Sequence, residues 1–197
     1  MDRDRDPVLG EFFASQSINT IADAIVRESV QNSLDATIEN RSTRVRFTLG
    51  KAKKSETKEL FDGLWEHIEA SDAEAGELKK KNDFRFLVVE DFSTTGLRGD
   101  IDDVRGEDQN ENEFYYFLRA EGKSSKSGAD RGSWGVGKFT YLHVSRINTM
   151  FIYTVRENPD QQGGRGPLAM GEAVLKNHKV DDDHFTPDGY LGNIEKL

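Results

Sequence analysis

The chain has 197 residues and a formal net charge of −9, from 27 Lys and Arg against 36 Asp and Glu. Its length suits one domain with its own core, its acidic balance argues against a nucleic-acid coat, and the absence of cysteine excludes disulfide frameworks, cysteine-ligated zinc and cysteine nucleophiles. No apolar run is long enough to cross a bilayer, and residues 1–7 alternate in charge without a hydrophobic leader. We therefore expect a cytoplasmic protein without membrane contact.

The pattern of apolar and polar residues predicts helices that alternate with strands, which is typical of an α/β sandwich in one domain. Helices are predicted at 17–38, 51–81, 113–121 and 138–145, and strands at 44–49, 84–90, 147–156 and 168–176. The 84–90 strand has apolar residues on both faces, so we expect burial on both. Segments 97–112 and 122–137 are predicted to be loops and 158–167 a turn, and the acidic tail after Val180 is only weakly patterned.

The first helix carries three polar residues on one stripe. Glu28, Asn32 and Asp35 are spaced by four and three residues, which places them within about 60° of one another. The opposite face is apolar and consists of Val26, Val30 and Leu34. A helix with apolar residues on two sides is expected to be buried, so the stripe would face something polar inside the domain. The alternative is an ordinary solvated helix face.

A second polar position follows the predicted 84–90 strand. Asp91 ends this strand and precedes a turn of small residues that includes Gly96. Ligands bind at the ends of strands in many α/β proteins, and a carboxylate accepts hydrogen bonds from an exocyclic amine such as that of adenine. The alternative is that Asp91 only caps its own turn.

A third segment combines glycines with a following helix. Gly132, Gly135 and Gly137 precede the predicted helix, and residues 119–138 carry a local charge of +3. Glycines allow close approach of backbone to a phosphate, and a helix N-terminus offers free N–H groups, although a flexible linker is the alternative. Phe139 replaces the Ser or Thr of a P-loop, and Thr140 replaces the third glycine of a dinucleotide fingerprint, so both of those motifs are rejected.

In order and separation, the three segments resemble the GHKL ATPase superfamily of gyrase B-type subunits, large heat-shock chaperones, histidine kinases and MutL. The family's first box, Glu-x-x-x-Asn-x-x-Asp-Ala, is matched fully from Glu28 to Ala36. The second box, Asp-x-Gly-x-Gly, is matched in part, with Ser93 at its first glycine and the second glycine displaced to Gly96. The third box, Gly-x-x-Gly-x-Gly, is matched by Gly132, Gly135 and Gly137.

The resemblance implies a Bergerat fold, a two-layer α/β sandwich whose mixed, mostly antiparallel sheet has helices on one face. ATP would lie between these helices and a flexible lid at about 97–137. The resemblance implies that Glu28 is the catalytic general base, that Asn32 coordinates Mg²⁺ and that Asp91 binds the adenine amine. Asp35 would orient the residues that contact the ligand by hydrogen bonding. The charge and position of Lys138 suggest that it would contact a phosphate. The full nucleotide-binding set is Asn32, Asp35, Ala36, Asp91, Gly96, Gly132, Ser133, Trp134, Gly135, Val136, Gly137 and Lys138.

We therefore expect residues 1–197 to form a single ATP-binding domain, either an isolated module or a piece of a longer protein. Its expected function is Mg-dependent ATP binding and slow hydrolysis, with lid closure gating an ATP-dependent homodimer or the binding of a protein partner or downstream domain. The general character resembles prokaryotic MORC-like and DNA-defence ATPases, without direct nucleic-acid binding by this chain. Two alternatives are a nucleotide-sensing interaction module without turnover and a domain that binds no nucleotide.

Overall fold

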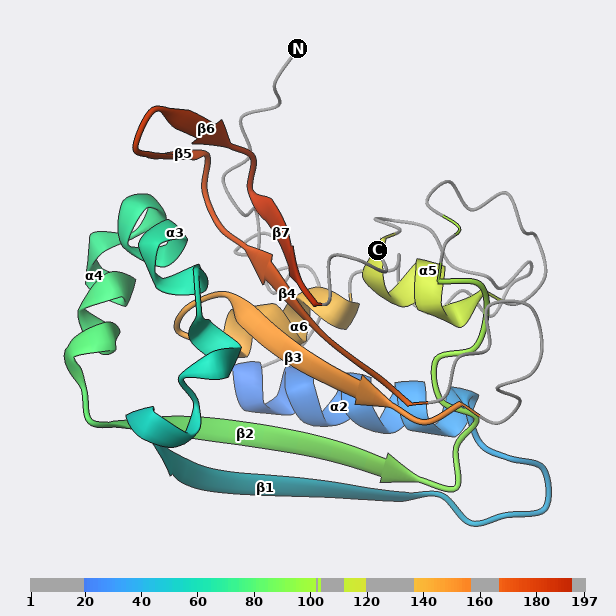
Figure 1. Cartoon of the computed structure of the whole chain (residues 1–197). Helices are drawn as coiled ribbons and strands as arrows, with labels where there is room; N and C mark the ends of the chain where they lie inside the picture. Colours follow the sequence, from blue (N-terminus) through green and yellow to red (C-terminus); the bar gives the residue numbers. More distant parts are fainter. Residues whose placement is uncertain (1–19, 102, 104–111, 120–136, 157–166, 193–197) are drawn as a thin grey trace.

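The structure, a computed structural model, describes residues 20–101, 103, 112–119, 137–156 and 167–192. Its helices are α2 (Ile21–Asp35), α3 (Leu64–Ser71), α4 (Ala73–Gly76), α5 (Glu113–Leu118) and α6 (Gly137–Val144). Its strands are β1 (Arg44–Lys53), β2 (Asp83–Phe92), β3 (Thr149–Thr154), β4 (Leu168–Val174), β5 (His178–Val180), β6 (Asp183–Phe185) and β7 (Asp188–Leu191). Figure 1 shows helices beside antiparallel strands, which confirms the predicted α/β class.

The described strands form three separate antiparallel sheets. β1 pairs with β2 over their full lengths, from Arg44 opposite Phe92 to Lys53 opposite Asp83. β4 lies between β3 and β7, and β5 pairs with β6 in a short hairpin. No ladder joins β2 to β3 among the described residues, and Leu97 N instead donates to Thr154 Oγ1 at 2.9 Å. The structure thus shows helices with antiparallel sheets, whereas the resemblance implies one mixed sheet.

Two apolar clusters hold helices against the β3–β4–β7 sheet. The first joins α3 and α4 to the end of β4 and contains Leu64, Ile68, Ala75, Ala173 and Leu175. The second joins α5 to β3 and β4 and contains Ile101, Phe114 and Leu118, with Ile152 and Met170 packed against it. Aromatic rings connect the first cluster to the ribbon, since Phe61 lies 5.1 Å from Trp65 and 5.5 Å from Phe84.

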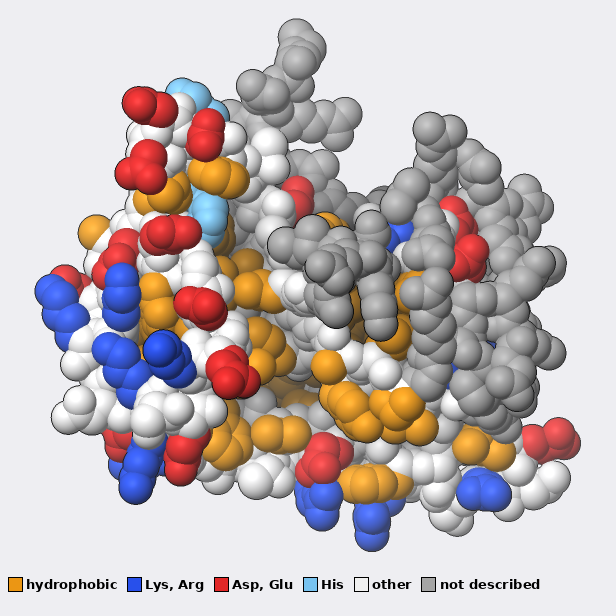
Figure 2. Space-filling view, in the orientation of Figure 1, with side chains coloured by type: hydrophobic (Ala, Val, Ile, Leu, Met, Phe, Trp, Pro, Cys, Tyr) orange, Lys and Arg blue, Asp and Glu red, His pale blue; other side chains and the backbone are white. Residues whose placement is uncertain are grey.

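The β1–β2 ribbon is more exposed than its sequence predicts. Phe86 and Val88 of β2 are 40% and 39% exposed, so the expectation of a strand buried on both faces is wrong. Leu49 of β1 is 85% exposed, although the alternating pattern placed it on a buried face. By the register, Leu49 lies on the face of the ribbon opposite to Phe86 and Val88, so neither face is completely covered by the described elements. Figure 2 shows apolar side chains on the surface of this side of the molecule.

Segment 51–81 is not one helix. β1 continues to Lys53, and the segment then forms the 3₁₀ turns η1 (Lys54–Glu56) and η2 (Glu59–Phe61), followed by α3, α4 and η3 (Glu77–Lys80). Gly63 at φ 72° precedes α3, and Asp72 ends it and caps α4 by accepting from Glu74 N and Ala75 N. The apolar spacing predicted one helix, although the Asp62-Gly63 pair is a turn signal that marks the break before α3.

The later elements agree better with the sequence. The predicted helices at 113–121 and 138–145 correspond to α5 and α6, and the predicted strands at 147–156 and 168–176 correspond to β3 and β4. The weakly patterned tail forms β5, β6 and β7, strands of three or four residues that are too short to give a readable alternation. Within the described part of the chain, none of the helices has the length and apolarity that crossing a membrane requires.

Candidate nucleotide site

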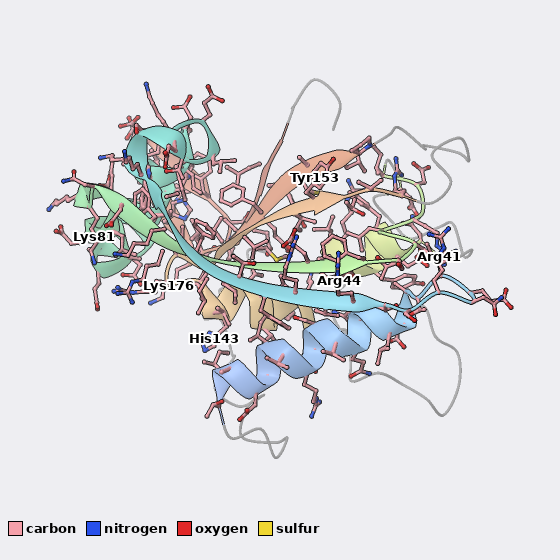
Figure 3. All side chains as sticks on the ribbon, turned by 90° about the horizontal axis from the view of Figure 1, so that it is seen from below. Arg41, Arg44, Lys81, His143, Tyr153 and Lys176 are labelled. Carbon is pink, nitrogen blue, oxygen red and sulfur yellow. The ribbon has the colours of Figure 1, made fainter. Side chains whose placement is uncertain are left out.

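Helix α2 places the first box. The helix begins after Thr20, whose hydroxyl accepts from Asp23 N at 3.1 Å, and Figure 3 shows it running along the β1–β2 ribbon. Its buried residues are Ala24, Ile25, Glu28, Ser29 and Ser33. The other apolar residues are exposed, Val26 at 46%, Val30 at 36% and Leu34 at 62%. The expectation of a helix buried on two sides is therefore wrong, because the described elements pack against α2 along one face only.

The polar stripe of α2 runs from the interior to the surface. Glu28 is 7% exposed, and Arg27 Nη2 lies 3.5 Å from Glu28 Oε1. Asn32 and Asp35, one and two turns further along, are both exposed. A solvated helix face therefore describes Asn32 and Asp35 but not Glu28, whose carboxylate lies at the inner end of the stripe. Such burial is uncommon for a glutamate and fits a group that works at the floor of a site.

Asp91 lies against α2. Its position in β2 is opposite Val45 of β1, and Ser33 Oγ donates to Asp91 Oδ2 at 3.2 Å. The other carboxylate oxygen accepts from Thr94 Oγ1 at 3.1 Å, so Asp91 does cap its own turn. Each oxygen of an ionised carboxylate has two acceptor positions, so this exposed side chain can also accept from a ligand amine.

The turn after β2 is fixed by two residues with left-handed backbone. Ser93, which stands at the first glycine of the second box, has φ 63°, a conformation that glycine adopts without strain. Gly96 has φ 70°, and a Cβ there would lie 2.4 Å from Val155 O. Backbone hydrogen bonds from Ile38 N to Ser93 O and from Thr95 N to Ala36 O attach this turn to the end of α2. The first and second boxes therefore form one connected wall.

Of the third box, only its last glycine, Gly137, lies within the described residues. Residues 132–136, with Gly132, Ser133, Trp134, Gly135 and Val136, lie outside the described residues, as does most of the predicted lid at 97–137. Gly137 begins α6, which packs against α2. Lys138 is 6% exposed, and its ammonium donates to Leu118 O at 2.7 Å and lies 3.5 Å from Glu172 Oε1. A phosphate contact by Lys138 stays a prediction and would require this buried pairing to change.

Tyr141 of α6 connects the third box to the first. Its hydroxyl donates to Ser29 Oγ at 3.0 Å. Burial raises the pKa of Tyr141 above its ordinary value, and the charges of Asp91 and Glu28 act in the same direction. The phenol thus lies among residues of both other boxes and stays protonated at neutral pH.

Tyr141, Ser29 and Ser33 were not among the site residues predicted from the sequence. Ser29 donates its proton to Ile25 O at 2.6 Å, so its oxygen can accept from another group. The single Ser33 proton is shared between Ser29 O at 2.8 Å and Asp91 Oδ2 at 3.2 Å. Two serines four residues apart on an otherwise apolar helix face were a readable signal. Tyr141 lies about one turn after Gly137 and therefore on the same side of α6, which also could have been read from spacing.

The oxygen groups on this wall suit a hard cation. Among the described residues, no group of three or more His, Asp or Glu side chains is arranged to hold a metal ion. Mg²⁺ needs no such cage, because it is usually held by one or two protein oxygens together with waters and substrate phosphates. The exposed amide of Asn32, one turn from the Glu28 carboxylate, fits a site of that kind.

Comparisons with known proteins identified no relative of this chain. No protein-family model matches the chain, and no curated protein or solved structure matches it either.

Proposed function

We propose that this chain is an ATP-binding domain of the Bergerat type that binds Mg–ATP and hydrolyses it slowly. The observation that supports this most is the convergence of the three motif-bearing segments on α2. Ser33 holds Asp91 of the second box, and Ser29 holds Tyr141 just after the third box. Accidental motif matches would have no reason to meet on one helix face.

At the adenine end, Asp91 would accept a hydrogen bond from the exocyclic amine. Ser33 and Thr94 fix the orientation of the carboxylate, so little side-chain entropy is lost when a base binds. Gly96 lets the turn approach the end of β3 closely, which keeps Asp91 and the end of α2 in register. The same carboxylate would repel the carbonyl oxygen that guanine carries at the corresponding position.

At the phosphate end, Asn32 would hold the magnesium ion through its amide oxygen. The ion would neutralise phosphate charge, and Glu28 would accept a proton from the attacking water. Glycines 132, 135 and 137 would bring backbone N–H groups to the phosphates ahead of the α6 N-terminus. Because Glu28 is buried next to this end, its carboxylate is held in place before substrate arrives.

One observation favours the second candidate, a nucleotide-sensing module without turnover. The Lys138 ammonium is paired with Leu118 O and Glu172. In this arrangement it does not also stabilise the negative charge that develops on a phosphate during hydrolysis. Slow or absent hydrolysis by the chain alone follows from either candidate. The ATP-dependent homodimer, the protein partner and the cytoplasmic location stay predictions.

Calorimetric titration with ATP, with and without Mg²⁺, tests the proposal together with a phosphate-release assay. We expect the chain to bind ATP and Asp91→Ala to weaken binding about tenfold or more, as loss of a charged hydrogen bond does. The matched control is Asp182→Ala, which removes an exposed carboxylate beside Lys179 and should leave binding unchanged. ATP binding without any phosphate release would favour the sensing module, and no binding at all would refute both candidates.

A further inference from the structure

The outer edge of β1 is a long row of backbone groups with no described strand beside it. β1 pairs with β2 along all ten of its residues, and among the described strands none lies on its other side. Figure 1 shows β1 along the lower border of the molecule, below β2. An edge of this length is a template on which another extended chain can pair.

Two hydrogen bonds at the end of β1 show which backbone groups face outward. Lys54 N donates to Asn82 O at 2.9 Å, on the side of β2. Lys53 N points the other way and donates to Glu56 Oε2 at 2.7 Å, so a carboxylate of the chain itself occupies the last outward N–H group. The direction of the N–H and C=O groups alternates along an antiparallel strand. The remaining outward groups therefore belong to Val45, Phe47, Leu49 and Lys51.

The charge of β1 indicates what kind of chain fits this edge. β1 carries four cations and no acid, and β2 carries one cation and three acids, which leaves the ribbon with a formal charge of +2 in a chain of −9. Arg46 is paired with Glu90, and Lys51 Nζ lies 3.7 Å from Asp83 Oδ2. The cations at the two ends of β1, Arg44 and Lys53, form no ion pair with another described residue. An acidic segment would pair with them.

A second copy of β1 does not fit the same edge. The cations lie in both halves of the strand, so an antiparallel second copy would bring Arg44 and Arg46 against Lys51 and Lys53. A parallel copy would bring each cation beside its own duplicate. Like charges in such neighbouring positions destabilise strand pairing.

The outward residues also carry exposed apolar side chains. Leu49, in the middle of the set, is 85% exposed, and Phe47 is 38% exposed. The two residues are two positions apart, so their side chains lie on the same face of the ribbon. A strand that pairs with this edge would cover both with its own apolar side chains, which removes apolar area from water.

We propose that the outer edge of β1, from Val45 to Lys51, binds an extended acidic segment of a partner protein as an additional strand. The backbone of the segment pairs with the outward groups of Phe47 and Leu49, and its carboxylates face Arg44 and Lys53. This inference does not depend on the proposed nucleotide binding, because none of these residues belongs to the candidate nucleotide site.

The first test is a fluorescence polarisation titration of the full chain with a labelled nine-residue peptide in which glutamate and valine alternate. We expect this probe to bind, and to bind more weakly as salt rises. Two control peptides have lysine in place of glutamate, or proline in place of valine, and neither should bind measurably. Equal binding of the lysine peptide would overturn the charge argument. Equal binding of the proline peptide, which cannot form a paired strand, would overturn the strand pairing.

The pair Leu49→Pro and Leu49→Ala separates the backbone from the side chain. Proline removes one outward N–H and leaves the bonds between β1 and β2, a position that edge strands tolerate. We expect Leu49→Pro to bind the glutamate–valine peptide about tenfold more weakly than Leu49→Ala, with the fold of each checked by circular dichroism. Equal affinities of the two folded variants would overturn the inference.

A charge reversal tests the end of the edge. Arg44→Glu should weaken binding of the glutamate–valine peptide a few fold, as loss of an exposed ion pair does. The matched control is Lys179→Glu, which reverses an exposed cation on the β5–β6 hairpin and should leave the affinity unchanged. Equal effects of the two reversals would mean that only the net charge of the chain matters, which contradicts a site on β1.

Amide hydrogen exchange of the wild type reads the edge without any substitution. In the free chain, the amides of Phe47 and Leu49 should exchange fast, whereas those of Thr48 and Gly50, which face β2, should exchange slowly. The glutamate–valine peptide should slow Phe47 and Leu49. Slow exchange at these two positions in the free chain would overturn the inference. If it occurs at every concentration, another part of this chain covers the edge, and if it occurs only at high concentration, a second copy does.

Discussion

Ser33 Oγ donates a hydrogen bond of 3.2 Å to Asp91 Oδ2 across 58 positions of sequence. Ser33 directly follows Asn32, so Asp91, the proposed adenine acceptor, is held by the same turn of α2 that carries Asn32, the proposed magnesium ligand. The wall that would bind the nucleotide is therefore built by tertiary contacts rather than by one local motif. From this wall we predict the preference for ATP over GTP, the magnesium dependence of binding, the tolerance of the turn after β2 to a side chain and the pH dependence of stability.

The wild-type chain should prefer ATP to GTP. Asp91 can accept from the adenine amine but would face the guanine carbonyl oxygen, and an unpaired buried polar group costs about 1–3 kcal/mol. We expect GTP to bind about tenfold more weakly or worse in competition titrations. Asp91→Ala should reduce this preference. Equal affinities of the wild type for both nucleotides would remove Asp91 from the base-recognition role.

Asn32→Ala should weaken Mg–ATP binding about tenfold or more while leaving metal-free ATP binding nearly unchanged. The reason is that Asn32 supplies an oxygen to the cation rather than a contact to the nucleotide. Gln31→Ala is the control, because Gln31 points about 100° away around the same helix. Equal losses with and without Mg²⁺ would show that Asn32 has no metal role.

The turn after β2 should be far less tolerant of a side chain at Gly96 than the turn before α3 is at Gly63. Both glycines have left-handed φ, 70° and 72°, so each Ala substitution costs about 1–2 kcal/mol in backbone strain. A Cβ at Gly63 meets nothing within 4 Å, whereas one at Gly96 meets Val155 O at 2.4 Å. Denaturant unfolding should therefore show a larger loss for Gly96→Ala, and equal losses would mean that the turn moves freely away from β3.

Alkaline pH should reduce the free energy of unfolding through Tyr141. Burial raises its folded-state pKa, so above the unfolded value of about 10 the unfolded chain releases this proton while the folded chain keeps it. The unfolded state then binds fewer protons, and stability falls as pH rises, whereas below pH 10 this contribution to the pH dependence is absent. Urea unfolding between pH 9 and 11 should show a shallower loss in Tyr141→Phe than in wild type, with Tyr153→Phe as the control.

Local patterns predicted several elements, among them α5, α6, β3 and β4, but not the breaks within 51–81, and they predicted burial poorly. The ranges of α5, α6, β3 and β4 follow from apolar spacing, because these elements present one clear face to the core. The exposure of Leu49, Phe86 and Leu34 could not be read from the same spacing, since it depends on which layers cover β1, β2 and α2. Whether a strand is buried on both faces depends on the elements that pack against it, and the sequence alone does not identify those elements.

The motif residues of the candidate site could be chosen from the sequence, but the contacts between them could not. Glu28, Asn32 and Asp91 were chosen from residue type, spacing and the family resemblance; the structure places Glu28 and Asn32 on α2 and Asp91 against it, and their roles stay predictions. The serines and Tyr141 that join them act through hydrogen bonds between distant segments, and Ser93 keeps the left-handed backbone of a glycine without being one. These contacts between distant segments, and the backbone conformation of Ser93, can be seen only in the folded structure.

The most direct test of the central claim is Glu28→Gln, which keeps the volume of the side chain and removes its basicity. Calorimetry and phosphate release should be measured together on the full chain with Mg–ATP, and circular dichroism should confirm the fold. We expect ATP affinity equal to or slightly tighter than wild type, because a negative charge near the phosphates is lost. Turnover should fall about 10²–10⁴-fold, the usual contribution of a general base. Loss of ATP binding together with turnover in a folded Glu28→Gln chain would contradict the account and make Glu28 a structural residue of α2.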